Sequence, residues 1–516
     1  MKKNMKPLTS RRDFLKLAGT LPFGFATSKF LKTVGLPPTY QAGQKNVLVI
    51  VFDAFSAYHI STYGYQRETT PNISRLAERA IVYHNHYAGA NFTTPGTASL
   101  LSGTLPWTHR AFQSNGTVDE SFVAHNIFNA FQKYYSIAYT QNPWANTLLE
   151  QFKNDINELV PWFSLFLKSF DDNFIHGLFK NDDDIASVSW ARNTNIREGG
   201  YAYSLLFSHI YQLLREKNVA DVKKRFPRGI PSIQSSQNSF TLEDANNWIV
   251  ERLPLIPQPF LGYFHFLPPH DPYRPPLEFY DHFNGDGFAP PEKPEDAFTQ
   301  HVSNADLLRM RAEYDEYILY VDREFNDLFE RLETSGVLEN TWVVLTSDHG
   351  ELFERGVSGH GTDMLYESVI RVPLMIFEPG RKTGDNIHTN TSVIDLLPTL
   401  LHVTGQGIPD WVEGKVLPPF SITGVDPNRT IYAMRSVRNG KFNPLTRATV
   451  TLTKGRYKLH YYFGYKEYNV NELVKLYDVE SDPDELVDLA SSHGDIANEM
   501  LTELKIKLDD VNERYR

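Results

Sequence analysis

The stretch Asn46-Val47-Leu48-Val49-Ile50-Val51-Phe52-Asp53 decides the fold class. Its unbroken apolar run leaves no polar side to face water, which is typical of a strand buried on both faces of a sheet. Strands of this kind occur almost only in parallel sheets that helices cover on both sides. We therefore expect a central strand here, with the carboxylate of Asp53 at its carboxyl end.

Three further runs have the same apolar character, and helical patterns lie between them. The runs are 260–266, 341–347 and 372–377. Helical spacing marks a long helix over 305–335, and Thr70 before Pro71 is a helix start whose hydroxyl could cap the first turn. Strands interleaved with helices predict an α/β fold with a mainly parallel sheet flanked by helices.

Chain length and local composition predict the domains. A chain of 516 residues is long for one compact core, so we expect two cores. We place an export signal and linker in 1–40, a catalytic domain in 41–424 and a small C-terminal domain with an antiparallel sheet in 425–516. Residues 145–235, which are rich in aromatic side chains, are expected to be an insertion that packs over the sheet or contacts substrate.

The N-terminal segment resembles an export signal. Ser10-Arg11-Arg12-Asp13-Phe14-Leu15-Lys16, followed by a weakly apolar run, is similar to a bacterial twin-arginine signal. It predicts export to the periplasm or the cell exterior. The alternative is a basic N-terminal segment that contains Arg-Arg by chance. No apolar stretch reaches the roughly 18 residues that a membrane span needs, so no transmembrane anchor is expected.

Charge and cysteine content exclude several classes of function. The net charge is −11 and no dense Lys/Arg cluster occurs, so a nucleic-acid partner is not expected. The chain has no cysteine, which excludes disulfides, thiolate metal ligands, cysteine nucleophiles and a formylglycine derived from cysteine. Composition does not indicate an oligomeric state.

Two carboxylates and an imidazole fall at the ends of predicted strands. Asp53 ends the first strand, and Asp348 with His349 follows the run 341–347. Because the carboxyl ends of parallel strands meet at one edge of a sheet, we expect these residues to form a divalent-cation site. The alternative is that each caps a turn or helix, which would be favoured if either stood alone.

A hydroxyl-rich segment offers a candidate nucleophile. Phe92-Thr93-Thr94-Pro95-Gly96-Thr97 enters a helical pattern, and Pro95 suits an early helical position. The free N–H groups of such a helix start point at an anion. The hydroxyl of Thr93 could act as a nucleophile if a metal ion bound its oxygen and lowered its pKa. The alternative is an N-cap.

Two histidines are candidates for catalysis. His270 follows the run 260–266 among prolines, and His360 lies between two glycines, so both are expected on loops. Beside an anion site, such a histidine can bind the transferring group or protonate the leaving oxygen, whereas elsewhere it is merely solvated. His84 and His86 have a metal-like spacing but fall in a predicted strand, so we expect them to be structural.

Several segments resemble motifs of the sulfatase-like branch of the alkaline phosphatase superfamily, and they do so in sequence order. The match covers about residues 45–490, apart from the expected insertion. The segments are VIVFDAFSAYHISTYGYQRETTPNISRLAERA (49–80), TTPGTASLLSG (93–103), NTWVVLTSDHGE (340–351), GHGTDMLYESVIRVPLMIF (359–377), VIDLLPTLLHVTG (393–405) and KLYDVESDPDELVDLA (475–490).

The resemblance implies a fold and a set of roles. It implies an alkaline phosphatase-like large domain with a smaller C-terminal antiparallel sheet, acting on sulfate or phosphate esters at one divalent metal ion: Mn, Zn, Mg or Ca. It implies a metal site of Asp53, Thr93, Asp348 and His349, with Thr93 as the nucleophile. It also implies that His270 and His360 are catalytic residues.

The sequence departs from the family pattern at four positions. Thr93 replaces the modified cysteine, and Ala54, Thr97 and Thr362 stand where the family carries an aspartate, an arginine and a lysine. Because cations that would hold a leaving sulfate are missing, phosphate esters or diesters fit better than sulfates. In the use of a threonine as nucleophile, the sequence resembles the phosphoethanolamine transferases and the lipoteichoic acid synthases.

These observations favour a metal-dependent, sulfatase-like hydrolase that cleaves phosphate or sulfate esters through a covalent intermediate on Thr93. Its expected partner is an ester substrate, with a glycan or lipid headgroup as a candidate. One alternative is a transferase that moves a phospho-headgroup to an envelope glycan or lipid. Another is a catalytically inactive binding protein of the same fold, although a decayed site would not need Asp53, Asp348 and His349 together.

Overall fold

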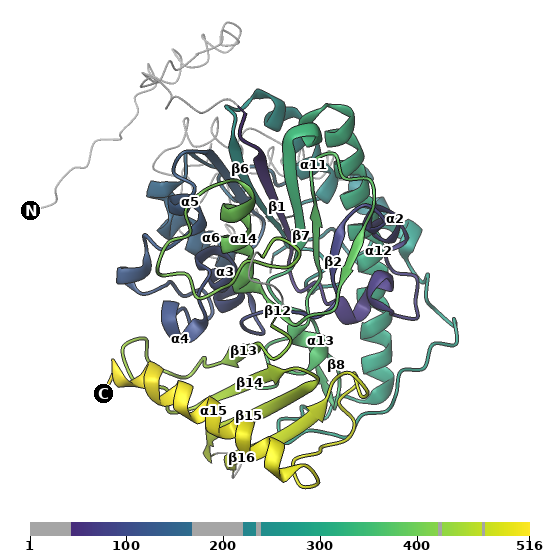
Figure 1. Cartoon of the computed structure of the whole chain (residues 1–516). Coiled ribbons are helices and arrows are strands. Elements are labelled where there is room, and N and C mark those ends of the chain that lie inside the picture. Colours follow the sequence, from purple (N-terminus) through teal and green to yellow (C-terminus); the bar gives the residue numbers. More distant parts are fainter. Residues whose placement is uncertain (1–42, 168–219, 234–238, 422–425, 467–469) are drawn as a thin grey trace, which may run out of the picture. The chain divides into compact units, whose positions relative to one another are not determined.

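The computed structural model describes residues 43–167, 220–233, 239–421, 426–466 and 470–516. The predicted signal and linker (1–40) lie outside these residues. The described chain is built on an eight-stranded sheet with the order β11-β2-β10-β7-β1-β6-β4-β5 (Figure 1). Its strands are β1 (Asn46–Phe52), β2 (Ile81–Tyr83), β4 (Tyr135–Thr140), β5 (Glu158–Leu159), β6 (Phe260–Phe266), β7 (Thr341–Thr346), β10 (Leu374–Phe377) and β11 (Asp385–Ile387).

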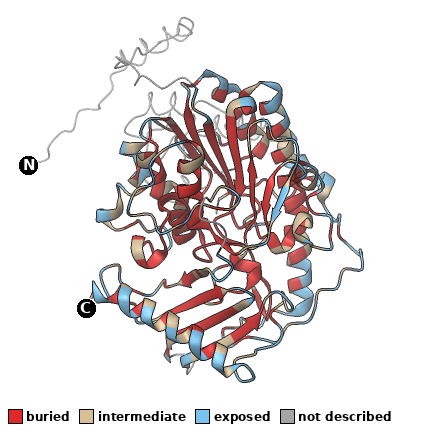
Figure 2. Cartoon of the chain, viewed as in Figure 1, coloured by how far each residue is buried: buried red, intermediate tan, exposed pale blue. Residues whose placement is uncertain are grey.

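The strand β1 is central, as its apolar run predicts. It lies between β6 and β7 and pairs with both in parallel. Alternate side chains of β1 enter two different apolar clusters, with Val49 on one face of the sheet and Ile50 on the other. Figure 2 shows that the strands around β1 are buried. The run is continuously apolar because both of its faces pack against helices.

Helices cover both faces of the sheet, which confirms the predicted α/β architecture. On one face lie α3 (Thr93–Ser102), α6 (Pro143–Gln151) and α14 (Leu396–Val403), whose apolar residues join the cluster of Val49. On the other lie α2 (Pro71–Ala77), α11 (Leu242–Arg252) and α12 (Asn304–Thr334), which join the cluster of Ile50. Among the helices of the described residues, none combines the length and apolarity needed to cross a membrane.

The strand β10 departs from the parallel arrangement. It pairs antiparallel with both β7 and β2. The connection from β7 to β10 contains the hairpin of β8 (Phe353–Glu354) and β9 (Val357–Ser358) and the short helix α13 (Glu367–Ile370). No long crossover helix returns the chain to the opposite edge, so β10 enters the sheet from the edge at which β7 ends.

The C-terminal part forms the predicted small antiparallel sheet. Its order is β13 (Thr430–Arg435), β14 (Ala448–Lys454), β15 (Tyr457–Tyr465) and β16 (Val470–Asp478), and α15 (Gly494–Glu513) packs against it (Figure 1). Val450 and Leu504 belong to the same apolar cluster as Val49 of β1. The two separate cores expected from chain length are therefore wrong, because one cluster runs from the large sheet into the small one.

The first part of the predicted insertion belongs to the large sheet. Residues 145–151 complete α6, which buries Leu148 and Leu149, and β5 pairs in parallel with β4. The aromatic composition of this region concealed a strand–helix–strand unit. Residues 168–219 and 234–235 of the predicted insertion lie outside the described residues, and the boundary predicted at 424–425 stays a prediction.

Candidate functional site

The carboxyl ends of β1, β6 and β7 bring three side chains together. Asp53 follows β1, His265 is the next-to-last residue of β6, and Asp348 lies shortly after the end of β7. The Nε2 atom of His265 lies 3.2 Å from Oδ2 of Asp53 and 3.9 Å from Oδ2 of Asp348. All three side chains are fully buried. The edge predicted from strand ends therefore places two carboxylates around one imidazole.

The hydroxyl of Ser347 and the close approach of helix α3 hold this edge in place. The hydroxyl of Ser347 donates to the carbonyl oxygen of Phe52 at 2.6 Å and accepts from the N–H of Phe55 at 2.9 Å, which ties β7 to the end of β1. Helix α3 approaches so closely that a Cβ added to Gly96 would lie 2.3 Å from the carbonyl oxygen of Asp348. Only glycine lets the start of this helix pack against Asp348.

His349 completes the predicted group of metal-binding residues. Its Nε2 atom lies 3.3 Å from Oδ1 of Asp53 and 3.6 Å from Oδ2 of Asp348. Its Nδ1 atom lies 2.9 Å from the carbonyl oxygen of Gly350. With Nδ1 donating to that carbonyl oxygen, Nε2 is the atom that faces the carboxylates.

Thr93 lies beside Asp53 and is not a helix cap. It is the first residue of α3, whose N-cap is Phe92 with no side-chain capping bond. The side-chain amide of Asn142 donates to Oγ1 of Thr93 at 3.3 Å and also to Oδ2 of Asp53. The structure thus rejects the N-cap interpretation and places the hydroxyl of Thr93 next to the first carboxylate.

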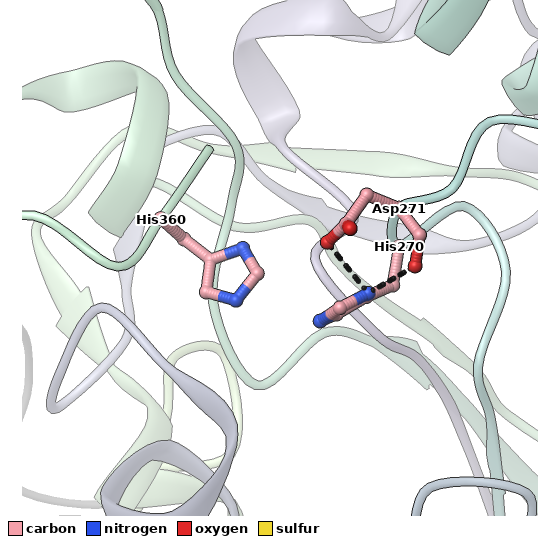
Figure 3. A group of neighbouring side chains, drawn as sticks. All are labelled: His270, Asp271 and His360. Carbon is pink, nitrogen blue, oxygen red and sulfur yellow. Dashed lines mark hydrogen bonds and ion pairs between the residues drawn. The ribbon is translucent and has the colours of Figure 1, made fainter. Parts of the chain in front are cut away.

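The two predicted loop histidines lie side by side, as Figure 3 shows. The ring centroids of His270 and His360 are 4.7 Å apart, and those of His349 and His360 are 4.3 Å apart. The Nδ1 atom of His360 lies 3.0 Å from Oε1 of Glu351, and Nδ1 of His270 donates to the carbonyl oxygen of Asp271 at 2.7 Å. All six residues predicted from the sequence therefore belong to one connected group.

The charges of this group shift the pKa values of the buried residues. Burial alone would raise the pKa of Asp53, but the charge of His270 and hydrogen bonds from His265 and His349 hold it well below its usual range. Burial and the charge of Asp53 raise the pKa of Asp348. Burial opposes the charge of His349, yet the two carboxylates raise its pKa to about 9. The group therefore attracts positive charge.

The loop histidines are shifted in opposite directions. Burial lowers the pKa of His270, but the charge of Asp53 outweighs it and the net shift is upward. Burial and the neighbouring charge of His349 hold the pKa of His360 well below its usual range. Burial raises the pKa of Glu351 to about 8, and the charge of Asp271 adds to this. One imidazole is therefore stabilised in its protonated form and the other in its neutral form.

Three residues of the group are not among those predicted from the sequence. They are His265, Asn142 and Glu351. His265 is a polar residue inside an otherwise apolar strand, Asn142 precedes a proline at a helix start, and Glu351 lies two residues after His349. Each signal was present, but each is more often structural than functional when taken alone.

The residues that depart from the family pattern contribute to the frame of the site. The hydroxyl of Thr97 donates to Oδ2 of Asp348 at 3.4 Å, and the carbonyl oxygen of Thr362 accepts from the amide of Asn91 at 2.7 Å. Ala54 has a φ of 58°, a left-handed conformation that turns the chain sharply after β1. Its N–H donates to Oδ1 of Asp348 at 3.4 Å.

Two sets of side chains in the described residues bring metal-binding atoms within 4.8 Å of one another. The first consists of Asp53, His265 and Asp348 and is fully buried, so the structure contains a candidate Asp/His metal site. The second consists of His270, Asp271 and His360 (Figure 3). In this second set the carboxylate of Asp271 is largely exposed and lies 3.1 Å from Nδ1 of His270.

Comparison with known proteins identifies relatives of this chain. The choline-sulfatase of Rhizobium meliloti is 25% identical over 479 residues, which cover 87% of this chain and 83% of that protein. The multifunctional alkaline phosphatase superfamily protein PehA of Trinickia caryophylli is 24% identical over 420 residues, covering 74% and 78%. The phosphonate monoester hydrolase of Agrobacterium radiobacter has the same fold, with a TM-score of 0.63 at 18% identity, covering 92% of this chain and 96% of that chain.

Family models cover nearly the whole of the described chain. The model for the C-terminal region of N-sulphoglucosamine sulphohydrolase matches residues 360–514. The model named Sulfatase matches residues 45–406, which include both strand-end carboxylates, Thr93 and the two loop histidines. The chain therefore belongs to the sulfatase family and is a sulfatase-like ester hydrolase.

Proposed function

We propose that this chain hydrolyses phosphate or sulfate esters through a covalent intermediate on Thr93, at a site that binds one divalent metal ion. One observation carries the proposal: a single amide, that of Asn142, contacts both the hydroxyl of Thr93 and the carboxylate of Asp53. The candidate nucleophile is thereby held within the group of carboxylates and imidazoles. Its place at the start of α3 adds free N–H groups that favour an anionic ester.

The residues present fit a divalent cation. Oδ1 of Asp53 and Nε2 of His349 are buried and lie 3.3 Å apart, and neither atom hydrogen-bonds any other group among the described residues. Two neighbouring buried carboxylates are costly unless positive charge compensates them. Carboxylate oxygens and imidazole nitrogens suit Mg, Mn, Zn or Ca to different degrees. Asp53, Asp348 and His349 would hold the ion together with Thr93, and His265 is a further candidate ligand.

The side chains divide the chemistry between them. A bound divalent ion supplies positive charge that lowers the pKa of a hydroxyl and stabilises charge on the oxygens of the ester. Oγ1 of Thr93 attacks the phosphorus or sulfur atom, its proton passes to solvent, and the bond to the leaving oxygen breaks. His270 and His360 contact the transferring group or give a proton to the leaving oxygen. Water then hydrolyses the ester on Thr93.

The substrate proposal favours phosphate esters and diesters over sulfates. Thr97 and Thr362 are uncharged where the family carries cations. The hydroxyl of Thr97 contacts Asp348, and Thr362 contributes only its backbone carbonyl oxygen to the contact with Asn91. One relative is named a choline-sulfatase and another a multifunctional alkaline phosphatase superfamily protein. An assay should therefore include both phosphate esters and sulfate esters.

The test combines metal analysis with a panel of aryl phosphate monoesters, diesters and sulfate esters. Thr93→Ala removes the nucleophile and is expected to lower kcat by at least about 100-fold, the scale on which lost nucleophiles act. Thr94→Ala is the matched control, because Thr94 is equally buried but its hydroxyl accepts from the N–H of Asn115, with no contact to the carboxylates among the described residues. Equal rates for Thr93→Ala and Thr94→Ala would reject the nucleophile.

The same assay separates the alternative functions. Turnover in water alone supports a hydrolase, whereas turnover that requires an added acceptor alcohol supports transfer of a phospho-headgroup to a glycan or lipid. A purified protein that neither binds a divalent ion nor turns over any ester would support an inactive binding protein.

We also propose export through the twin-arginine pathway, with residence in the periplasm or outside the cell. Support comes from Arg11-Arg12 and the residues that follow them. Replacing both arginines with lysine should leave the protein in the cytoplasm of a bacterial host, as measured by fractionation. Unchanged export of that variant would reject this route.

A further inference from the structure

The carboxylate of Glu351 lies behind His360. Glu351 is fully buried, and its Oε1 and Oε2 atoms lie 3.0 Å and 3.3 Å from Nδ1 of His360. The two residues are nine positions apart, on the loop that follows β7 and on the turn after the β8–β9 hairpin. This contact brings a buried acid and a histidine of the site into direct hydrogen-bonding distance.

Hydrogen bonds to the backbone also hold His360 next to Glu351. The N–H of Gly359 donates to the carbonyl oxygen of Leu352 at 2.8 Å, which docks the residue before His360 on the residue after Glu351. The amide of Asn91 donates to the carbonyl oxygen of His360 at 3.0 Å. The loop is thus held from both sides, and the remaining freedom of His360 is rotation of its ring.

The contact with Glu351 selects the nitrogen that His360 presents to the site. An imidazole has two nitrogens, and a hydrogen bond at one determines which atom the other offers to a ligand. Since Glu351 occupies Nδ1, Nε2 remains for the site. Figure 3 shows the rings of His270 and His360 side by side. Of the two ring nitrogens of His270, the one that does not contact Asp271 points toward the ring of His360.

A buried carboxylate is costly to keep for packing alone. Among the described residues, His360 is the side chain that hydrogen-bonds the carboxylate of Glu351. Glutamine or an apolar residue would fill this space without burying an acid, and removing a carboxylate from water is unfavourable unless a partner compensates it. The acid therefore has a purpose connected with the imidazole.

We propose that Glu351 is a positioning residue that holds His360 through Nδ1, so that Nε2 faces the leaving oxygen of the ester. This rests on the proposed function. Neutral His360, with Nδ1 donating to Glu351, accepts at Nε2, through solvent, the proton that the hydroxyl of Thr93 releases. It gives this proton to the leaving oxygen as the bond from phosphorus or sulfur to that oxygen breaks. The water molecule that later hydrolyses the ester on Thr93 gives a proton to Nε2, which passes it to Oγ1 of Thr93 as that ester bond breaks, so that the hydroxyl and the neutral imidazole are both restored.

Esters with different leaving groups test this position. A nitrophenolate leaves without a proton, whereas an unsubstituted phenol needs one, so loss of a positioned acid affects the phenyl ester more. Glu351→Ala should lower kcat for the phenyl ester at least about tenfold more than for the 4-nitrophenyl ester, with little change in KM. Glu351→Gln, whose amide oxygen still accepts from Nδ1, should recover most of this difference.

Glu485→Gln is the matched control. Glu485 is a second buried glutamate that contacts an imidazole, since its Oε1 lies 2.8 Å from Nε2 of His460 in the C-terminal sheet. Any loss in this variant should be the same for both esters. Equal losses for both esters in Glu351→Ala, or no loss, would overturn the positioning role.

A spectroscopic readout keeps this inference separate from the proposed function. In protein labelled with ¹⁵N-histidine, the Nδ1 signal of His360 is assigned by its disappearance in His360→Asn. We expect the signal of a hydrogen-bonded nitrogen in the wild type and a shifted signal in Glu351→Ala. An unchanged signal overturns the inference even in an active enzyme. A shifted signal in a protein that cleaves no ester rejects the proposed function but leaves the contact established.

Discussion

At the scale of single residues, Asn142 joins the fold to the candidate site. Its Oδ1 atom accepts from the N–H of Trp144 at 2.7 Å and caps α6, while its amide nitrogen donates to Thr93 and Asp53. One side chain therefore starts a helix and orients the candidate nucleophile. The two contributions can be separated, because serine caps helices well but is too short to replace the amide.

Asn142→Ser and Asn142→Ala should lower activity alike and stability differently. We expect kcat to fall by about tenfold or more in both, since each loses the amide that holds Thr93 beside Asp53. The alanine variant should also lose about 1 kcal/mol of unfolding free energy through the missing cap, whereas the serine variant should lose much less. Urea unfolding and ester kinetics measure the two effects. Full activity of the serine variant would contradict the role given to the amide.

At this scale, site residues could be predicted from the sequence where a carboxylate or a histidine follows the end of a predicted strand. Asp53, Asp348 and His349 could be predicted because parallel strands bring their carboxyl ends together. Asn142 and His265 could not, because their place in the site depends on the order β7-β1-β6-β4 and on side-chain direction across it. Neither property can be read from spacing along the chain.

At the scale of elements, the start of α3 packs directly on the loop after β7. Gly96 makes this possible, because any larger residue would place a Cβ against the carbonyl oxygen of Asp348. Helix and loop each carry part of the site, Thr93 on one and Asp348 with His349 on the other. Their separation therefore determines the geometry of the group.

Gly96→Ala should separate these two elements. The added Cβ, only 2.3 Å from the backbone oxygen, forces a shift that we expect to lower kcat/KM by roughly tenfold or more and the unfolding free energy by about 1–3 kcal/mol. Gly407→Ala is the control, since a Cβ there meets nothing within 4 Å. Steady-state kinetics and thermal unfolding test the pair. If both variants behave like the wild type, the close packing has no functional consequence.

The start of α2 shows why element ends are harder to predict than elements. The sequence predicts a helix after Thr70 with Pro71 at its first position, and α2 begins there. The hydroxyl of Thr70 does not cap it. Instead the carboxylate of Asp322, on α12, accepts from the N–H groups of Asn72 and Ile73 at 3.1 Å and 2.7 Å. A residue about 250 positions away supplies the cap, which local reasoning cannot detect.

At the scale of the whole molecule, the fold class followed from patterning, but the joining of its two sheets did not. The unbroken apolar run of β1 implied helices on both faces of the sheet, and the structure has them. The length argument predicted two cores, yet Val450 of the small sheet packs in the cluster of Val49. Apolar periodicity shows which face of an element is buried and not which partner covers it.

Buried histidines should make the folded protein sensitive to acid. Burial lowers the pKa of His86 and His109 to about 3 and that of His460 to about 4. Unfolded histidine titrates near 6.5. The folded state thus favours the neutral form, so the contribution of these residues is complete above pH 6.5. It is lost as the pH falls from 6.5 toward 3–4.

The unfolding free energy should therefore decline below pH 6.5, by up to about 1.4 kcal/mol per pH unit for each histidine. His109→Gln removes one titrating group, because glutamine stays neutral. Denaturant unfolding between pH 7 and pH 4.5 should give a slope for this variant that is smaller by about 1.4 kcal/mol per pH unit. The same slope in both proteins would show that His109 is not buried in its neutral form.

The most direct test of Thr93 as the nucleophile is to locate the covalent intermediate. Protein incubated with a reactive aryl phosphate or sulfate ester is quenched in acid and digested, and the peptides are analysed by mass spectrometry. We expect one phosphoryl or sulfuryl group on Thr93, present in the wild type and in Thr94→Ala and absent from Thr93→Ala. A modified residue other than Thr93, or full turnover by Thr93→Ala without any adduct, would contradict it.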